Sequence, residues 1–330
     1  MPLFMKVYIA EEAGFCFGVK RALNIINRLH EKGHKVQVYG QLIHNRGVLD
    51  ELKARGIDCI DSLDQLDPGK NLVIRTHGIP KSVEANLEKN GVKYIDATCP
   101  LVKKLQETIA GLNTDSPGTR VVIVGDKNHP EIIAVKSYCP DALVIDSEAE
   151  ALRMENSKHI RVAAQTTLDV DFFEHIISIL KNKTENLHIH NTICSATKIR
   201  QEAIKKLAPQ VDGVIVVGGK NSSNTRKLYN IALKKNKNTF HIEKSSDLDD
   251  AHWLEKLNRF QSVGITAGAS TPPGEIELML SLESVNRFST LLRSIRVLTM
   301  SIEKNFDIPF VADLALREKQ IFILREQEQR

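Results

Sequence analysis

The segment Asp96-Ala97-Thr98-Cys99-Pro100-Leu101-Val102-Lys103 places a cysteine where a strand-like run gives way to a helical one. Lys93–Ala97 is typical of a short strand, and a proline directly after the cysteine is favoured in the first turn of a helix. Lys103 follows the cysteine by four residues, about one helical turn further on. The segment therefore predicts a strand–cysteine–helix junction.

Two further segments repeat this junction, and in both a lysine again follows the cysteine by four residues. They are Ala13-Gly14-Phe15-Cys16-Phe17-Gly18-Val19-Lys20 and Asn191-Thr192-Ile193-Cys194-Ser195-Ala196-Thr197-Lys198. The three cysteines stand 83 and 95 residues apart. The shared strand–cysteine–helix pattern indicates three copies of one αβ unit.

Polar clusters follow each cysteine at the ends of two later strands. The first clusters contain His44, His129 and Ser222, which follow their cysteines by 28, 30 and 28 residues. The second clusters are Arg75-Thr76-His77-Gly78, Gln165-Thr166-Thr167 and Thr266-Ala267-Gly268-Ala269-Ser270. Ligands of parallel α/β sheets bind beyond the carboxyl ends of the strands, so we expect these clusters to border one site.

Strand-like and helical segments alternate along most of the chain, which predicts an α/β fold with parallel sheets. We expect three αβ units, related by a pseudo-threefold axis, around a central metal site. The predicted units are 14–98, 99–193 and 194–284, with the third sheet completed by a strand in 1–13, and with 285–330 as a C-terminal helical tail. The expected strands are Lys6–Glu11, Lys35–Tyr39, Asn71–Arg75, Lys93–Ala97, Arg120–Gly125, Ala142–Asp146, His159–Ala164, Asn186–His190, Val211–Val217, Thr239–Ile242 and Gln261–Thr266. The expected helices are Gly18–Lys32, Ser82–Asn90, Pro100–Leu112, Val170–Lys181, Ser195–Ala208 and Ser223–Lys235.

The composition is that of a globular protein without a nucleic-acid or membrane partner. The 330 residues carry 45 Lys+Arg and 41 Asp+Glu, a net charge of +4 that is too small and scattered for nucleic-acid binding. No apolar run approaches the roughly 18 residues of a membrane span, and acidic residues come too early for a signal peptide. We therefore expect a cytoplasmic protein. Its five cysteines are an odd number, which argues against a disulfide framework.

The three repeated cysteines predict a metal site. A thiol at a helix N-terminus has a lowered pKa, and the resulting thiolate binds iron or zinc. Cys59 and Cys139 break the pattern and are expected to be ordinary half-buried residues. The ligands are too far apart for a zinc ribbon, although catalytic zinc with three cysteines stays open. A cubane cluster on three thiolates, which would leave one iron for a substrate oxygen, is the favoured interpretation.

The polar clusters predict an anion site with a proton donor. His44, His77 and His129 could neutralise a phosphate group. In the third unit Ser222, Ser223, Asn224 and Ser270 stand at helix starts, where free N–H groups bind anions; the alternative is that Ser223 and Ser270 are only N-caps. Glu131 is either a proton donor near the metal, oriented by Thr166 or Thr167, or a surface carboxylate.

Taken together, these segments resemble the 4-hydroxy-3-methylbut-2-enyl diphosphate reductase family, also called IspH or LytB. The resemblance runs from about Val7 to Glu283. It rests on Gly14-Phe15-Cys16-Phe17-Gly18-Val19, Gly40-Gln41-Leu42-Ile43-His44-Asn45, Asp96-Ala97-Thr98-Cys99-Pro100-Leu101-Val102, His129-Pro130-Glu131, Gln165-Thr166-Thr167-Leu168, Gly219-Lys220-Asn221-Ser222-Ser223-Asn224-Thr225 and Gly268-Ala269-Ser270-Thr271-Pro272.

The resemblance implies one [4Fe–4S] cluster per chain, held by Cys16, Cys99 and Cys194. It implies reductive dehydroxylation of (E)-4-hydroxy-3-methylbut-2-enyl diphosphate to isopentenyl and dimethylallyl diphosphate, the last step of the non-mevalonate (MEP) pathway. Glu131 would relay protons, and His129 and Thr166 would surround the substrate hydroxyl. The diphosphate would be held by His44, His77, Ser222, Ser223, Asn224 and Ser270.

Two other functions stay open on the residues alone: a zinc-dependent hydrolase of a phosphorylated substrate, and a non-enzymatic iron–sulfur sensor or carrier. The sequence contains no G-x-G-x-x-G or Walker fingerprint. We therefore expect an external electron donor of the ferredoxin or flavodoxin type.

Overall fold

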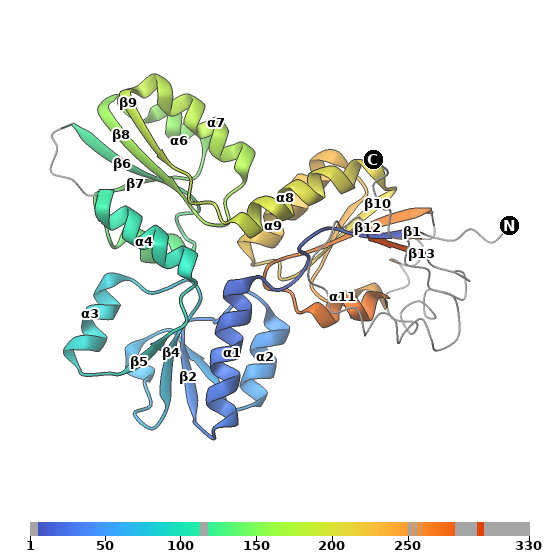
Figure 1. The fold of residues 1–330 in the computed structure, drawn as a ribbon, viewed down its shortest axis with the longest axis horizontal. Helices are drawn as coiled ribbons and strands as arrows, with labels where there is room; N and C mark the ends of the chain where they lie inside the picture. The colour runs from blue at the N-terminus through green and yellow to red at the C-terminus, as the bar shows by residue number, and fades with distance from the viewer. Residues whose placement is uncertain are drawn as a thin grey trace, which may run out of the picture. The chain divides into compact units, whose positions relative to one another are not determined.

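The computed structural model describes residues 6–112, 118–249, 253, 256, 257, 259–280 and 296–299, and there every strand pairing is parallel (Figure 1). The chain divides into two compact units. Cys16–Lys198 contains two sheets and is called the two-sheet unit below. Met1–Phe15 together with Ile199–Arg330 contains the third sheet and is called the one-sheet unit. The expected α/β class with three small parallel sheets is confirmed.

The first sheet of the two-sheet unit has the strand order β3-β2-β4-β5. Its strands are β2 (Val36–Tyr39), β3 (Asp58–Ile60), β4 (Asn71–Ile74) and β5 (Tyr94–Asp96). Its helical segments are α1 (Phe17–Glu31), α2 (Arg46–Ala54), the 3₁₀ turn η1 (Leu63–Gln65) and α3 (Lys81–Lys89). Branched side chains such as Leu72 and Ile74 are buried beneath α3 and pack with Leu87. Because the four strands are parallel, they all end at one edge of the sheet, where the segments of His44, His77 and Cys99 begin.

The second sheet repeats this plan with the order β7-β6-β8-β9. Its strands are β6 (Thr119–Val124), β7 (Leu143–Ile145), β8 (Ser157–Ala164) and β9 (Thr184–His190). Its helical segments are α4 (Pro100–Leu112), α5 (Pro130–Lys136), α6 (Glu148–Arg153), α7 (Val170–Leu180) and the 3₁₀ turn η2 (Lys181–Lys183). Two apolar clusters, one with Phe173 and Ile176 and one with Leu105 and Ile109, form its core.

The two sheets of this unit are joined where α5 ends beside the start of α3. Pro80 occupies the N-cap of α3 and gives it no side-chain cap. Instead the Lys81 backbone N–H donates to the Ser137 hydroxyl at 2.8 Å, and the Tyr138 hydroxyl donates to Glu84 Oε2 at 3.3 Å. One sheet's segment therefore supplies the missing helix cap of the other.

The one-sheet unit has the strand order β11-β10-β12-β1-β13. Its strands are β1 (Lys6–Ile9), β10 (Gly213–Val217), β11 (Thr239–Ile242), β12 (Ser262–Ala267) and β13 (Arg296–Thr299). The chain enters it through α8 (Ser195–Leu207), and its other helical segments are the 3₁₀ turns η3 (Ala208–Gln210) and η4 (Ser245–Asp249), α9 (Ser223–Lys235) and α11 (Pro273–Leu280). β1 pairs in parallel with β12, so the N-terminal strand is part of this sheet.

Two expectations about the chain differ from the structure. Arg296–Thr299 is a strand paired with β1, so the predicted helical tail 285–330 was wrong for these four residues; the rest of that tail lies outside the described residues. Cys59 is exposed and Cys139 is buried, so neither is half-buried, although both are free thiols as expected. The bounds of the three αβ units, 14–98, 99–193 and 194–284, stay a prediction. Among the residues that the structure describes, no helix is long and apolar enough to cross a membrane.

Candidate functional site

Each repeated cysteine stands at the start of a helix, as its junction predicts. The cysteine carbonyl accepts the backbone N–H of the lysine four residues on, at 3.0, 2.9 and 3.0 Å for Cys16–Lys20, Cys99–Lys103 and Cys194–Lys198. The repeated Cys-x₃-Lys spacing is therefore the first turn of a helix.

Two of the cysteines are also pinned to the end of a neighbouring strand. The Cys99 N–H donates to the Thr76 carbonyl at 2.9 Å, and the Cys194 N–H donates to the Thr166 carbonyl at 2.9 Å. The two sheets therefore present their cysteines through the same backbone contact.

The three thiols lie in one neighbourhood of the two-sheet unit. Cys16 and Cys194 both act electrostatically on the Cys99 thiol. A Cβ added to Gly18 would lie 2.7 Å from Cys99 Sγ and 3.9 Å from Cys16 Sγ. All three cysteines are partly exposed and none forms a disulfide. Three clustered, accessible soft donors fit an iron–sulfur centre, and they would also suit zinc.

The pKa of the Cys99 thiol is raised, whereas a thiol at a helix N-terminus was expected to have a lowered pKa. Burial raises its pKa, while the N–H groups of Leu101 and Val102 oppose that rise and the neighbouring Cys16 and Cys194 add to it. Loss of hydration outweighs the helix N-terminus here, because the N–H donors stabilise the thiolate less than water does.

His44, His77 and His129 meet at the ends of their strands, as predicted. Their ring centroids are 4.6 Å (His44–His77), 5.2 Å (His77–His129) and 5.5 Å (His44–His129) apart. One ring nitrogen from each lies within 4.8 Å of the others. Such a group can bind an anion through N–H donors, and its spacing would also admit a metal ion.

Burial and like charge keep His77 neutral. Burial lowers its pKa well below the usual value, and His44, His129 and Arg75 lower it further. Its Nδ1 is buried and finds no hydrogen-bond partner among the described residues. His77 thus offers an unsatisfied polar atom to a ligand, and an arriving anion would favour its protonation.

Glu131 is buried, not a surface carboxylate. It is 1 % exposed. Its Oε1 accepts the Thr166 N–H and its Oε2 accepts the Thr166 hydroxyl, both at 2.7 Å. His129, the N-cap of α5, accepts the Glu131 N–H on Nδ1 at 3.2 Å, so its neutral ring carries the proton on Nε2. The expected Glu131–Thr166 contact is therefore present.

The predicted serine and asparagine cluster lies in the one-sheet unit. Ser222 is the N-cap of α9, its hydroxyl accepting the Thr225 N–H at 3.4 Å, so the cap is Ser222 and not Ser223. Asn224 is 4 % exposed, and neither its Nδ2 nor its Oδ1 has a hydrogen-bond partner among the described residues. The turn that contains Ser270 packs close by, since a Cβ on Gly268 would lie 1.9 Å from Thr225 Oγ1.

Thr76 and Arg75 are site residues that the sequence analysis did not single out. Besides its bond to Cys99, Thr76 donates its hydroxyl to the Leu42 carbonyl at 2.8 Å and so holds the segment before His44. The repeat carried a signal for it, because Thr76 occupies the place of Thr166. Arg75 is a half-buried cation beside His77, and loss of hydration lowers its pKa.

Comparisons with known proteins agree on one family. The family profile described as LytB protein matches residues 7–282. Proteins named 4-hydroxy-3-methylbut-2-enyl diphosphate reductase include one from Thermoanaerobacter pseudethanolicus, 44% identical over 278 residues, and one from Aquifex aeolicus, 43% identical over 281 residues. Each alignment covers 83% of this chain and 94% of the relative.

Two solved structures are similar over their whole length. One is described as (E)-4-hydroxy-3-methyl-but-2-enyl diphosphate reductase, the terminal enzyme of the non-mevalonate pathway; it is 40% identical with a TM-score of 0.60 and covers 86% of this chain. The other, a reductase of E-1-hydroxy-2-methyl-but-2-enyl-4-diphosphate from Plasmodium falciparum, is 26% identical with a TM-score of 0.82 and covers 96% of this chain. Both are covered to 100% of their own length.

Gly18→Ala should disrupt the thiol cluster without unfolding the protein, because the new methyl group would meet Cys99 Sγ at 2.7 Å. Overpacking costs roughly 1–3 kcal/mol, so we expect the Cd²⁺ affinity of the metal-free protein to fall by about 5- to 150-fold. Thiolate-to-metal absorption measures this affinity. Gly111→Ala in α4 is the control, since nothing lies within 4 Å of its Cβ. Equal Cd²⁺ affinities in the two variants would contradict the proximity of these thiols.

His77 should make the free protein less stable in mild acid. Its folded pKa is lowered, so the unfolded chain binds the proton first, and stability is lost as pH falls below about 6.5, by at most about 1.4 kcal/mol per pH unit. Urea unfolding at pH 7.5 and 5.5 measures this slope. His77→Gln should flatten it and the exposed His30→Gln should not; a wild-type slope in His77→Gln would refute the assignment.

Asn224→Leu should separate binding from stability. Because both amide atoms are unpaired, we expect the free energy of unfolding to stay constant or rise by about 1 kcal/mol, while pyrophosphate affinity falls about tenfold or more. Asn236 lies at the other end of α9, and its Nδ2 donates to the Ala208 and Val211 carbonyls at 3.0 and 2.7 Å. Asn236→Leu should therefore lower the free energy of unfolding and leave pyrophosphate affinity unchanged. Calorimetric titration and urea unfolding measure both quantities. A destabilised Asn224→Leu with unchanged affinity would reverse this interpretation.

Proposed function

The chain belongs to the LytB family, and on this basis we propose that it is a 4-hydroxy-3-methylbut-2-enyl diphosphate reductase. The substrate (E)-4-hydroxy-3-methylbut-2-enyl diphosphate takes up two electrons and two protons, and its allylic hydroxyl leaves as water. The products are isopentenyl and dimethylallyl diphosphate, made in the terminal step of the non-mevalonate pathway. Family membership favours this function over a zinc-dependent hydrolase or an iron–sulfur carrier.

The observation that carries the proposal is the buried Glu131–Thr166 pair beside three histidines. A carboxyl group that is 1 % exposed and held by two donors has little use in stabilising a fold, because burying a charge is costly. A buried carboxyl group has a use beside the oxygen of a departing hydroxyl group. Allylic hydroxide is a poor leaving group and needs a proton in order to leave. In the proposal Glu131 supplies that proton, and Thr166 holds the carboxyl group in place.

Cys16, Cys99 and Cys194 would hold one [4Fe–4S] cluster per chain. Bound there, the cluster would supply the two electrons and a Lewis-acidic iron close to the substrate hydroxyl. The three clustered thiols support this assignment. The cluster type and the three-cysteine ligand set are part of the proposal.

The diphosphate would be bound by hydrogen-bond donors, and the proposed donors are His44, His77, Ser222, Ser223, Asn224 and Ser270. The His129 Nε2–H would point to the substrate hydroxyl. In this scheme the diphosphate supplies binding energy away from the reacting carbon, which holds the allylic chain in a productive position. The unpaired polar atoms of His77 and Asn224 support these roles.

Electrons would come from a separate ferredoxin- or flavodoxin-type donor. The sequence has no nucleotide-binding fingerprint through which this chain could draw electrons from NAD(P)H or a flavin itself. An anaerobic assay of the allylic diphosphate with a reduced viologen tests the function. Formation of isopentenyl and dimethylallyl diphosphate is expected, whereas a colourless, iron-free protein that hydrolyses the diphosphate would overturn the proposal.

Glu131→Gln should abolish proton delivery while keeping the site's shape, because the amide cannot donate the acidic proton. We expect the turnover number to fall about 10²- to 10⁴-fold, with iron content and substrate affinity within about threefold of wild type. Glu107→Gln, on the exposed side of α4, is the matched control. Turnover of Glu131→Gln at the wild-type rate would remove Glu131 from the reaction.

A further inference from the structure

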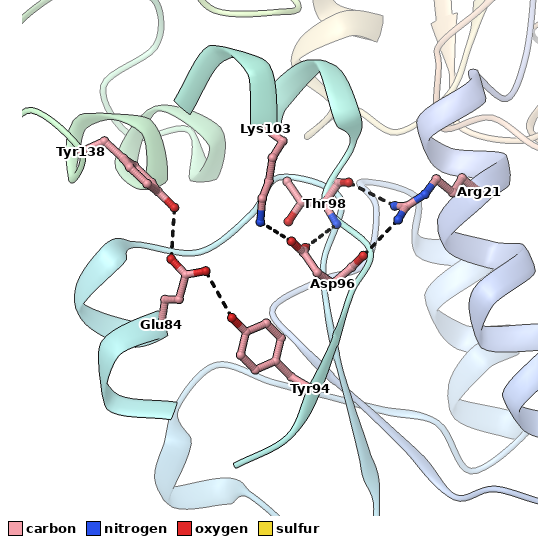
Figure 2. A network of polar contacts seen from close by, with 7 residues as sticks. All are labelled: Arg21, Glu84, Tyr94, Asp96, Thr98, Lys103 and Tyr138. Carbon is pink, nitrogen blue, oxygen red and sulfur yellow. Dashed lines mark hydrogen bonds and ion pairs between the residues drawn. The ribbon is translucent and has the colours of Figure 1, made fainter. Parts of the chain in front are cut away.

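The segment Asp96–Cys99 is held in shape by its own carboxylate. Asp96 Oδ1 accepts the Thr98 N–H at 2.9 Å, while Asp96 Oδ2 pairs with the Lys103 ammonium on α4 (Figure 2). The carboxylate therefore ties the turn before Cys99 to the first turn of the helix after it. Asn191 makes the corresponding turn before Cys194, its Oδ1 accepting the Ile193 N–H at 3.3 Å, but an amide oxygen carries no charge.

Arg21 reaches the same segment from α1. Its Nη1 donates to the Thr98 carbonyl at 3.1 Å, and its Nη2 donates to the Asp96 carbonyl at 3.2 Å (Figure 2). The guanidinium therefore forks over two carbonyls of one turn, and its planar, rigid geometry restrains both distance and orientation. A lysine could satisfy either carbonyl but could not reproduce the fork.

The fork joins the helix that begins after Cys16 to the turn that ends at Cys99. Arg21 stands five residues after Cys16, and Thr98 directly precedes Cys99. Because α1 is one hydrogen-bonded rod over this length, a restraint on Arg21 is passed to Cys16. The residues five after the other two cysteines are Lys104 and Ile199, neither of which carries a guanidinium.

We propose that Arg21 is a positioning residue for the iron–sulfur centre, fixing Cys16 relative to Cys99 in the protein before the cluster binds. This inference rests on the proposed function, because a shared cluster requires these two thiols at a set separation. Asp96 and Lys103 support it by holding the turn whose carbonyls Arg21 binds. The preformed thiol pair then costs less conformational entropy when the cluster is acquired.

The test compares Arg21→Gln, Arg21→Lys and Arg28→Gln in the full chain. Arg28 lies on the same helix, and its side chain is exposed. In the metal-free protein, Cd²⁺ titration followed by thiolate-to-metal absorption reports how well the thiols are placed. We expect at least tenfold weaker Cd²⁺ binding for Arg21→Gln and nearly as large a loss for Arg21→Lys, with Arg28→Gln within twofold of wild type.

A second measurement excludes a merely structural role. Urea unfolding identifies conditions in which each variant is fully folded, and the midpoint potential of the reconstituted cluster is then measured. A shift in Arg21→Gln that Arg28→Gln lacks supports the inference. Wild-type Cd²⁺ affinity and potential in folded Arg21→Gln would overturn it, and so would full rescue by Arg21→Lys, because charge alone would then suffice.

Failure of the inference differs from failure of the proposed function. If wild-type protein takes up the cluster and reduces the allylic diphosphate while Arg21→Gln matches it in both measurements, the inference is wrong and the function stands. If wild-type protein takes up no cluster, the function fails, and with it the need to position these thiols for one.

Discussion

The backbone hydrogen bond from Cys99 to Thr76, and its counterpart from Cys194 to Thr166, is the contact around which the two-sheet unit arranges its chemistry. Each threonine stands two residues after the end of a strand and uses its carbonyl to hold a cysteine. The Thr76 hydroxyl then holds the segment before His44, and the Thr166 N–H and hydroxyl hold Glu131. One residue type thus couples the thiols to the polar residues, because a threonine has both a backbone acceptor and a side-chain donor.

The free protein keeps polar atoms buried without partners at the places where a diphosphate is proposed to bind. The His77 Nδ1 and the Asn224 amide, both buried and unpaired among the described residues, cost stability in the absence of a ligand. An anion would relieve both costs, through protonation of one and hydrogen bonding of the other. This is the arrangement expected of a preorganised site, in which stability is given up for binding.

Much of the architecture could be predicted because its signals are local. The cysteine junctions, the alternating strands and helices such as Pro100–Leu112 were readable from a few neighbouring residues. Helix α5 was missed because its seven residues are too short to show a helical period. The contacts of Arg21 were missed because its partners lie 75 and 77 residues away in the sequence. The raised pKa of Cys99 was missed because burial is a property of the folded chain.

The Ser137 hydroxyl that caps α3 has a consequence for how the protein acquires its fold. A helix as short as α3, with a proline at its N-cap, gains little stability from its own sequence. Its first free N–H gains this protein partner only once the chain has been made as far as Ser137 and α5 has docked. The second sheet therefore stabilises the first in part, despite the repeat. We expect the two halves of Cys16–Lys198 to fold as one cooperative unit. During synthesis the first half would become fully stable only after the second half has been made.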